Sequence, residues 1–217
     1  MGSEMCIRDR LFGANLVSTL FAEDTRNDKL DLGLGVYKNS EGQTTILGSV
    51  KRAEARLLEH QNTNSYVGLA GDRTFSRRLA ELTMGSDQAW DRISLAQTPG
   101  GVAAMRVGFE MVYAARPDAT VWVSNPTWAN HPPIIEHAGL TVQAYPYFNK
   151  DTGGVDFDAM TKCLGSLPAG DVILLQVSCH NPTGAGLKNA QWDIIAELCS
   201  QRNLLPFLDV AYQGCGA

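Results

Sequence analysis

The chain has 217 residues, of which 44% are hydrophobic, enough to bury a substantial core in one or two domains. The net charge is -5 with acids and bases interspersed, so we expect neither nucleic acid nor a membrane surface as a partner. No apolar run approaches the roughly 20 residues that span a bilayer. The five cysteines are odd in number and show no C-x-x-C spacing, which predicts a reduced, cytoplasmic protein without a metal site.

The first 92 residues predict an arm followed by two helices. We interpret residues 1–10 as a non-native leader, because they do not join smoothly to the residues after them, and residues 11–48 as an N-terminal arm. Apolar residues at helical spacing predict a helix over residues 49–60 that serves packing only. Asp72 has the position of an N-cap for a second helix, which runs through Thr83.

Two segments of this part contain glycines, and each could have a structural role or a role in a binding site. Gly35 belongs to a short apolar segment with two glycines, which indicates either close approach of the backbone to a ligand or a tight turn in the arm. Tyr66 stands near Gly68 and Gly71, where a tyrosine most often anchors a loop. The residues alone leave both alternatives open.

A candidate phosphate cradle comes next in the chain. Residues 93–97 predict a strand, residues 98–101 a glycine turn, and an apolar stripe predicts a helix that ends near Ala115. Free backbone N–H groups and the positive end of a helix dipole favour an anion at Gly100 and Gly101. The Gly-Gly pair alone is weak evidence for a phosphate site, because most such turns merely cap helices.

Residues 120–124 predict a buried strand, and residues 141–145 a further strand by alternation. Trp128 and His131 follow the first of these strands. An aromatic plane on a strand-end loop suits stacking on a planar ring, although a core tryptophan is the commoner fate of this residue. His131 taken alone is typical of a hydrogen-bonded loop histidine.

The last part of the chain predicts a β-α-β unit. Residues 172–177 form an almost wholly apolar run, typical of a strand covered on both faces, and the turn residues 180–184 end it. An apolar stripe predicts a helix over residues 189–201. Residues 204–208 then predict a second strand.

Polar residues gather where these strands end. Open α/β sheets bind ligands at the carboxyl ends of their strands, so Asn181, Asp209 and Tyr212 are candidates to face one ligand. Asp209 and Tyr212 are three residues apart and would point to opposite faces of a continuing strand. They converge only if the strand ends near Asp209. A lone aspartate is more often a helix cap or a loop residue.

Residues 179–184 (Cys-His-Asn-Pro-Thr-Gly) and residues 209–214 (Asp-Val-Ala-Tyr-Gln-Gly) together resemble the class I aminotransferases that use pyridoxal 5′-phosphate (PLP). The closest likeness is to the aspartate and aromatic amino-acid aminotransferases, and it extends from about residue 12 to the end. It implies an α/β fold: residues 49–217 would belong to the large domain of a fold type I PLP-dependent transferase, a mostly parallel sheet flanked by helices. The chain would be a truncated N-terminal fragment that lacks most of the small domain.

The resemblance also implies a phosphate site. The family's phosphate loop matches Gly100, Gly101 and Val102, and Val102 stands where family members commonly have a hydroxyl residue. This cradle would therefore depend more on backbone N–H groups. The family tyrosine that matches Tyr66 reaches across a homodimer interface to the cofactor phosphate of the other subunit.

Five further residues match the family's positions around the cofactor ring and the substrate. By resemblance, Trp128 stacks on the PLP ring and also touches the substrate, and Asp209 lies beside the ring nitrogen with His131 beneath it. A carboxylate at that position favours the protonated ring nitrogen. Tyr212 and Asn181 would donate hydrogen bonds to the ring's phenolate oxygen, and Asn181 would also hold the substrate carboxylate.

The remaining matches concern the substrate and the catalytic lysine. Gly35 matches a residue that lies against the substrate carboxylate. The Schiff-base lysine follows a Ser-x-Ser-Lys pattern in the family and would lie beyond Ala217, so we expect no catalytic residue in this chain and no turnover. None of the chain's own lysines has that setting: Lys29, Lys38, Lys51, Lys150, Lys162 and Lys188.

We therefore predict a homodimeric enzyme that exchanges an amino group between an amino acid, aspartate or aromatic, and a 2-oxo acid through PLP and pyridoxamine phosphate. One alternative is another PLP enzyme on the same fold, such as a carbon–sulfur lyase. Another is a non-catalytic nucleotide-binding module that uses the Gly100–Gly101 turn, although the chain lacks a G-x-G-x-x-G fingerprint. A truncated product that binds partners has no direct support in the sequence.

Overall fold

The computed structural model describes residues 19–29 and 35–214, and the contacts within the chain divide it into two units, Met1–Thr63 and Asn64–Ala217. In the first unit α2 (Gly48–His60) confirms the helix expected at residues 49–60. This helix buries no side chain, so its packing role stays a prediction. The leader that we interpret at residues 1–10 lies outside the described residues, and the bounds of the arm and of the large domain stay predictions.

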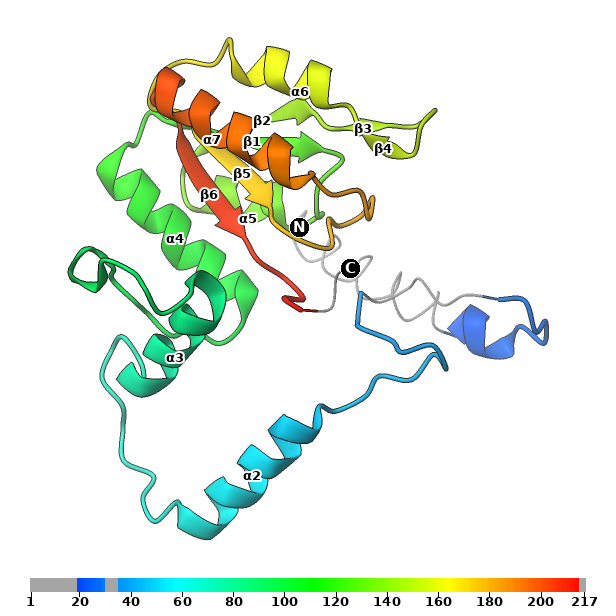
Figure 1. Cartoon of the computed structure of the whole chain (residues 1–217), viewed down its shortest axis with the longest axis vertical. Helices are drawn as coiled ribbons and strands as arrows, with labels where there is room; N and C mark the ends of the chain where they lie inside the picture. The colour runs from blue at the N-terminus through cyan, green and yellow to red at the C-terminus, as the bar shows by residue number, and fades with distance from the viewer. Residues whose placement is uncertain (1–18, 30–34, 215–217) are drawn as a thin grey trace, which may run out of the picture. The chain divides into compact units, whose positions relative to one another are not determined.

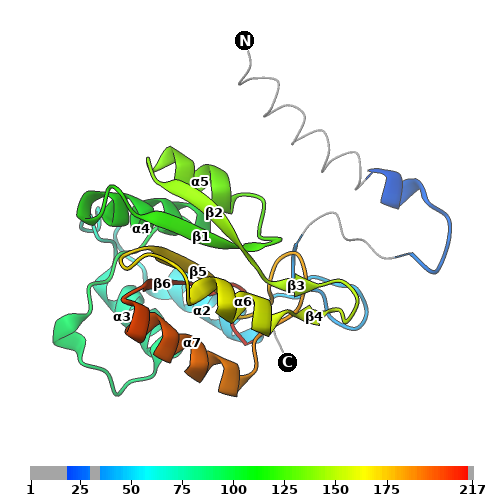
Figure 2. The same ribbon diagram turned by 90° about the horizontal axis from the view of Figure 1, so that it is seen from above.

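The second unit is built on a four-stranded parallel sheet in the order β2-β1-β5-β6 (Figures 1 and 2). Its strands are β1 (Thr120–Asn125), β2 (Thr141–Pro146), β5 (Val172–Gln176) and β6 (Leu205–Asp209). They confirm the strands expected at residues 120–124, 141–145, 172–177 and 204–208. A two-stranded antiparallel hairpin, β3 (Phe148–Asn149) with β4 (Gly154–Val155), follows β2.

Helices cover both faces of this sheet, as a parallel sheet requires. The helices on one face are α4 (Gly101–Ala115) and α5 (His131–His137), and those on the other are α6 (Phe157–Leu164) and α7 (Asn189–Arg202). Helix α3 (Arg73–Met84) and a 3-10 turn, η1 (Trp90–Arg92), precede them in the chain. The side chain of Asp72 accepts a hydrogen bond from the backbone N–H of Phe75, which confirms it as the N-cap of α3. No helix in the described part of the chain is long and apolar enough to cross a bilayer.

The two faces of β5 enter two separate cores, because successive side chains of a strand point to opposite sides. Val172 and Leu174 pack with the buried residues of α4 and α5, whereas Ile173 and Leu175 pack with those of α6 and α7. All four side chains are buried. This explains why residues 172–175 are continuously apolar.

The strand expected at residues 93–97 is wrong. These residues form no strand in the structure, and the main chain there bonds to a loop: Gln97 N–H donates to the carbonyl oxygen of Ala70 at 2.9 Å. The side chain of Gln97 also accepts a hydrogen bond from Asp72 N–H at 2.8 Å. An apolar run becomes a strand only where a neighbouring strand satisfies its backbone groups, and among the described residues none lies beside this one.

Strand β6 forms an edge of the sheet, since no strand in the described ranges pairs with its outer side. Leu205 and Leu208 are exposed on it at 40% and 55%. It also contains Pro206, which lacks an N–H and is tolerated at a sheet edge. Its inner packing is close, because the ring of Phe207 stacks on Phe109 of α4 with centroids 4.4 Å apart.

Candidate functional site

The sheet brings several predicted site residues to one edge. Strands β1, β5 and β6 are parallel, so their carboxyl ends lie on the same side of the unit. Strand β6 ends at Asp209, which is the condition that we expect for Asp209 and Tyr212 to converge. Gln176, the last residue of β5, is in register with Asp209, so the loop that carries Asn181 begins beside it.

Three predicted residues lie close together at this edge: Trp128, His131 and Asp209. The Nε2 atom of His131 is 3.2 Å from Oδ2 of Asp209. The rings of Trp128 and His131 meet edge to face with centroids 5.3 Å apart. Trp128 and Asp209 are half-buried and His131 is fully buried, so the histidine supports two side chains that remain accessible to a ligand.

The hydrogen bonds of His131 fix its orientation. An ionised carboxylate only accepts hydrogen bonds, so Nε2–H of His131 donates to Asp209. In the neutral ring Nδ1 is then an acceptor, and the hydroxyl of Thr127 donates to it at 2.6 Å. Because Thr127 begins the turn that leads into α5, this turn sets the position of the aspartate's partner.

A second buried histidine lies at the same edge, and sequence reasoning did not select it. His180 is 3% exposed, and its ring stacks on Tyr147 with centroids 4.1 Å apart. Its Nε2 lies 2.9 Å from the hydroxyl oxygen of Ser124, and its Nδ1 lies 2.9 Å from that of Thr183. Burial, with a smaller contribution from the nearby His131, lowers the pKa of His180 to about 4. It is therefore neutral near pH 7, with one ring nitrogen donating and the other accepting.

The loops that carry Asn181 and Tyr212 touch each other. The hydroxyl of Ser178 donates to the carbonyl oxygen of Ala211 at 2.8 Å. Asn181 is exposed, and Tyr212 is 39% exposed with a left-handed backbone (φ 57°). Both side chains thus stand near the end of β6 without being part of a core.

The predicted phosphate cradle has the local geometry of an anion site. Gly100 is the N-cap of α4, has φ 84° and supplies no side chain to bond the first N–H groups of the helix. In Figure 1, α4 runs in the direction opposite to β6, so its first turn lies toward the end at which β6 finishes. Val102 is 51% exposed in that turn. The first N–H groups of a 15-residue helix are thus open to a ligand.

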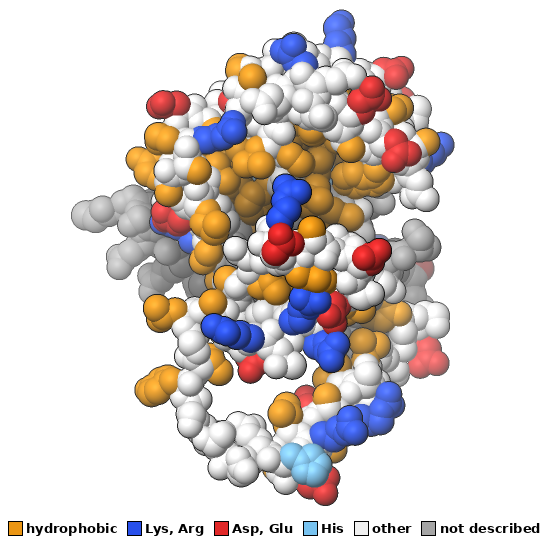
Figure 3. All heavy atoms as spheres, turned by 60° about the vertical axis from the view of Figure 1, so that its left-hand side comes forward, with side chains coloured by type: hydrophobic (Ala, Val, Ile, Leu, Met, Phe, Trp, Pro, Cys, Tyr) orange, Lys and Arg blue, Asp and Glu red, His pale blue; other side chains and the backbone are white. Residues whose placement is uncertain are grey.

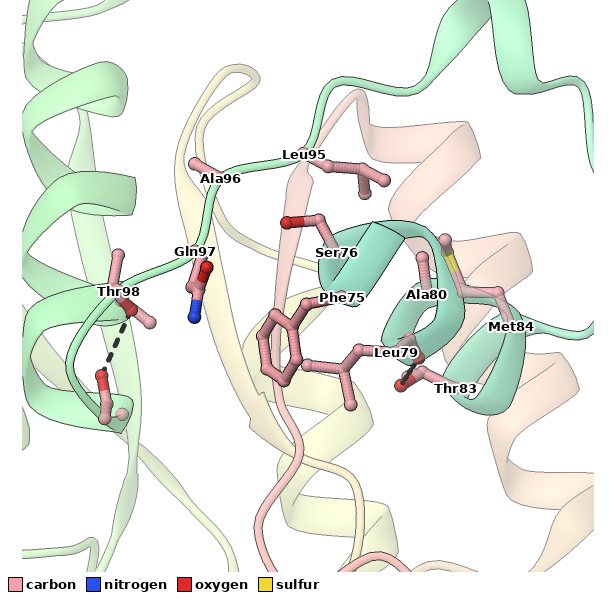
Figure 4. Close-up of a pocket in the computed structure, with 13 residues that line it drawn as sticks. Phe75, Ser76, Leu79, Ala80, Thr83, Met84, Leu95, Ala96, Gln97 and Thr98 are labelled. Atoms are coloured by element: carbon pink, nitrogen blue, oxygen red, sulfur yellow. Dashed lines mark hydrogen bonds between the residues drawn. The ribbon is translucent and has the colours of Figure 1, made fainter. Parts of the chain in front are cut away.

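A hollow of about 570 Å³ lies between α3 and the start of α4. Figure 3 shows hydrophobic side chains gathered on this side of the molecule, and Figure 4 shows side chains of α3 facing residues 95–98 across the hollow. Gly100 and Gly101 border the hollow, but Trp128 and Asp209 do not line it. Its walls are mainly apolar, so it does not suit a phosphate, and we distinguish it from the strand-end site.

The two remaining predicted residues, Tyr66 and Gly35, have exposed positions. Tyr66 is fully exposed, at 105%. Gly35 is exposed and belongs to the first unit, whereas the other candidates belong to the second. Their roles toward a partner subunit and a substrate stay predictions. Among the residues with described placement, no group of three side chains suits a metal ion.

Comparisons with known proteins identify the family of this chain. The model of the family "Aminotransferase class I and II" matches residues 27–217. An aromatic-amino-acid aminotransferase of Paracoccus denitrificans is 43% identical over 196 residues, which are 90% of this chain and 50% of that protein. An aspartate aminotransferase of Salmonella typhi is 42% identical over 201 residues, which are 91% of this chain and 51% of that protein.

Solved structures of such enzymes share the fold. The aromatic amino acid aminotransferase of Burkholderia cenocepacia superposes with a TM-score of 0.86 at 38% identity, over 92% of this chain and 51% of that one. The enzyme of Burkholderia pseudomallei, covalently bound to pyridoxal phosphate, gives 0.85 at 37% identity, over 94% and 51%. The chain thus spans about half the length of the relatives it matches. It belongs to the class I and II aminotransferases.

Proposed function

We propose that the strand-end site binds PLP and that the protein transfers an amino group between an amino acid, aspartate or aromatic, and a 2-oxo acid. The observation that carries the proposal is the carboxylate of Asp209, held 3.2 Å from a buried histidine at the end of a parallel strand. When bound, PLP supplies the electron sink that lets an amino acid lose its α-proton.

Asp209 fits the ring nitrogen of this cofactor. A carboxylate beside a pyridine nitrogen favours the protonated ring, because the opposite charge stabilises it. The bond from His131 occupies Oδ2 of Asp209 and leaves the side chain 21% exposed at the rim. The half-buried indole of Trp128, at right angles to the imidazole of His131, offers a flat surface for the ring.

The first turn of α4 fits the phosphate. Gly101 and Val102 present backbone N–H groups at the positive end of a 15-residue helix, whereas the N–H of Gly100 already donates to the carbonyl oxygen of Thr98 at 2.9 Å. Gly100 leaves room beside them, and Val102 adds no hydroxyl donor. Asn181 and Tyr212 would donate hydrogen bonds to the ring's phenolate oxygen, and Asn181 and Gly35 would bind the substrate carboxylate. Each of these roles remains part of the proposal.

The assembly and the location are also proposals. We infer a homodimer in which the exposed Tyr66 reaches the cofactor phosphate of the partner subunit. A cytoplasmic location agrees with the described cysteines, because Cys163, Cys179 and Cys199 are all free thiols. A nucleotide-binding module would need neither Trp128 nor Asp209, so their closeness favours the aminotransferase over that alternative.

The experiment is a titration with pyridoxamine 5′-phosphate, followed by calorimetry and tryptophan fluorescence. This form of the cofactor carries an amine instead of an aldehyde, so it binds without a covalent bond to lysine. We expect Asp209→Ala to weaken binding by roughly 100-fold, because the protonated ring loses its counter-charge. Asp193→Ala, at an exposed position of α7, is the matched control and should bind like the wild type. Equal affinities for wild type and Asp209→Ala would refute the proposed site.

A further inference from the structure

One glutamine holds the main chain of Asn181. The side chain of Gln176 accepts a hydrogen bond from Asn181 N–H at 2.9 Å, and its amide donates to the carbonyl oxygen of Asn181 at 3.1 Å. A side-chain amide carries one acceptor and two donors in a plane, so it suits this two-point contact in the way a neighbouring strand would. Within the described ranges no other residue binds these two groups of Asn181.

Gln176 is itself fixed to the strand that carries the candidate carboxylate. It is the last residue of β5, it is half-buried, and it pairs in register with Asp209. The next residue, Val177, donates its N–H to the carbonyl oxygen of Asp209 at 2.9 Å. The two hydrogen bonds of Gln176 therefore relate the position of Asn181 to that of Asp209.

This contact matters because Asn181 is exposed and lies in a loop. The preceding residue, His180, is anchored by its buried ring, but Asn181 has no buried side chain to fix it. A loop residue that binds a ligand must be held by its surroundings, because otherwise its ordering would oppose binding. In this turn the only such support on the main chain of Asn181 among the described residues comes from Gln176.

We propose that Gln176 is a positioning residue, which orients Asn181 toward the ligand at the strand-end site. The inference rests on the proposed function for the identity of that ligand, but the contact itself does not. Gln176 does not need to touch the cofactor. It acts by keeping the amide of Asn181 beside Asp209 before the ligand arrives.

The first test measures the contact without a ligand. In Gln176→Met, which keeps the length but not the hydrogen bonds, we expect amide hydrogen exchange of Asn181 to become at least about tenfold faster. Gln176→Glu keeps the acceptor for Asn181 N–H and replaces the donor, so the increase should be smaller. Gln201→Met makes the same change on the exposed face of α7, where the amide of Gln201 donates to Glu197, and should leave the exchange of Asn181 unchanged. Unchanged exchange in Gln176→Met would overturn the inference whether or not the cofactor binds.

The second test is a double-mutant cycle on the affinity for pyridoxamine 5′-phosphate. We expect Gln176→Met to weaken binding roughly fivefold in the wild type and to have no further effect in Asn181→Ala, because it acts through that residue. A merely structural role would weaken binding equally in both backgrounds, and that result would overturn the inference. If Asp209→Ala weakens binding while Gln176→Met does not, the proposed function stands and the role of Gln176 fails.

Discussion

Two Asn-Pro-Thr turns, residues 125–127 at the end of β1 and residues 181–183 after β5, are built alike and support different chemistry. Each contains a cis Asn–Pro bond, and in each the threonine hydroxyl lies within hydrogen-bond distance of Nδ1 of a buried histidine. In the first turn Nε2 of that histidine, His131, faces the carboxylate of Asp209. In the second, Nε2 of His180 faces the hydroxyl of Ser124.

The same threonine–histidine hydrogen bond thus has a structural role in one turn and supports the candidate site in the other. Burial keeps His180 neutral near pH 7, and its hydroxyl partners let the ring join β1 to the loop after β5. A carboxylate partner makes His131 the support of a charge at the rim of the site. The contrast predicts that changes around His131 alter ligand binding, whereas changes around His180 alter stability.

The largest expected effect comes from His131→Phe. The phenyl ring keeps a flat aromatic side chain at this position, but Oδ2 of Asp209 loses its donor and the carboxylate is no longer oriented. Hydrogen bonds to charged groups contribute about 1.5–3 kcal/mol, so we expect the affinity for pyridoxamine 5′-phosphate to fall by roughly 10- to 100-fold in calorimetry. Ser124→Ala, which changes the partner of the other histidine, should keep the wild-type affinity within about threefold. Equal losses in both variants would break the comparison.

The second effect is a loss of stability in acid that depends on His180. Its pKa is lowered from 6.5 to about 4 in the folded chain, so between these values the unfolded state binds more protons than the native state. The free energy of unfolding should therefore fall as the pH drops from 6.5 toward 4, by on the order of 2 kcal/mol.

Urea unfolding at several pH values measures this dependence. His180→Gln removes the titrating group and should flatten the curve in that window. The control, His60→Gln, changes an exposed histidine of α2 and should leave the slope as in the wild type. A slope that persists in His180→Gln would assign the acid sensitivity to another group.

A smaller effect is expected from Ser124→Ala on stability. The variant leaves Nε2 of the buried His180 without its partner, and an unsatisfied buried polar atom costs about 1–3 kcal/mol. We expect the urea midpoint to fall at an unchanged m-value. The control Ser86→Ala changes an exposed loop position and should lower the free energy of unfolding by less than about 0.5 kcal/mol. A neutral Ser124→Ala would mean that His180 is satisfied without this hydroxyl.

The smallest effects distinguish the two threonines. Thr127→Val removes one hydrogen bond to an imidazole and should cost about 1 kcal/mol in urea unfolding. Thr183→Val removes such a bond and also the acceptor of Ala185 N–H, so its cost should be about 1–2 kcal/mol. Only Thr127→Val should also lower the affinity for pyridoxamine 5′-phosphate, by roughly threefold, because the partner of Thr127, His131, supports Asp209. A larger loss of affinity for pyridoxamine 5′-phosphate in Thr183→Val than in Thr127→Val would contradict the comparison of the two turns.

Much of the fold could be predicted because its patterns are regular. The stripe from Val102 to Val112 and the apolar run at residues 172–177 identify α4 and β5, since burial on one or both faces leaves a clear period. The short helix α5 was not predicted, because its first turn holds Pro132 and Pro133 and looks like a loop. Prolines are tolerated there because the first N–H groups of a helix need no intrahelical acceptor.

The candidate site could likewise be predicted only in part from the sequence. The meeting of Trp128, His131 and Asp209 was expected from the family resemblance, and the structure brings the three together. The roles of Gln176 and His180 were not, because their partners are backbone atoms or hydroxyls set by the turn rather than by sequence spacing. The repeated Asn-Pro-Thr triplet was the one signal that could have directed attention to His180.

The outer side of β6 has a consequence for handling the chain. Its backbone groups form an open template on which another extended segment can add, and Leu205 and Leu208 expose apolar side chains on opposite faces of the strand. Pro206 interrupts that template, because its nitrogen has no hydrogen to offer a newcomer. Pro206 therefore opposes the pairing of β6 with an extended segment of a second molecule.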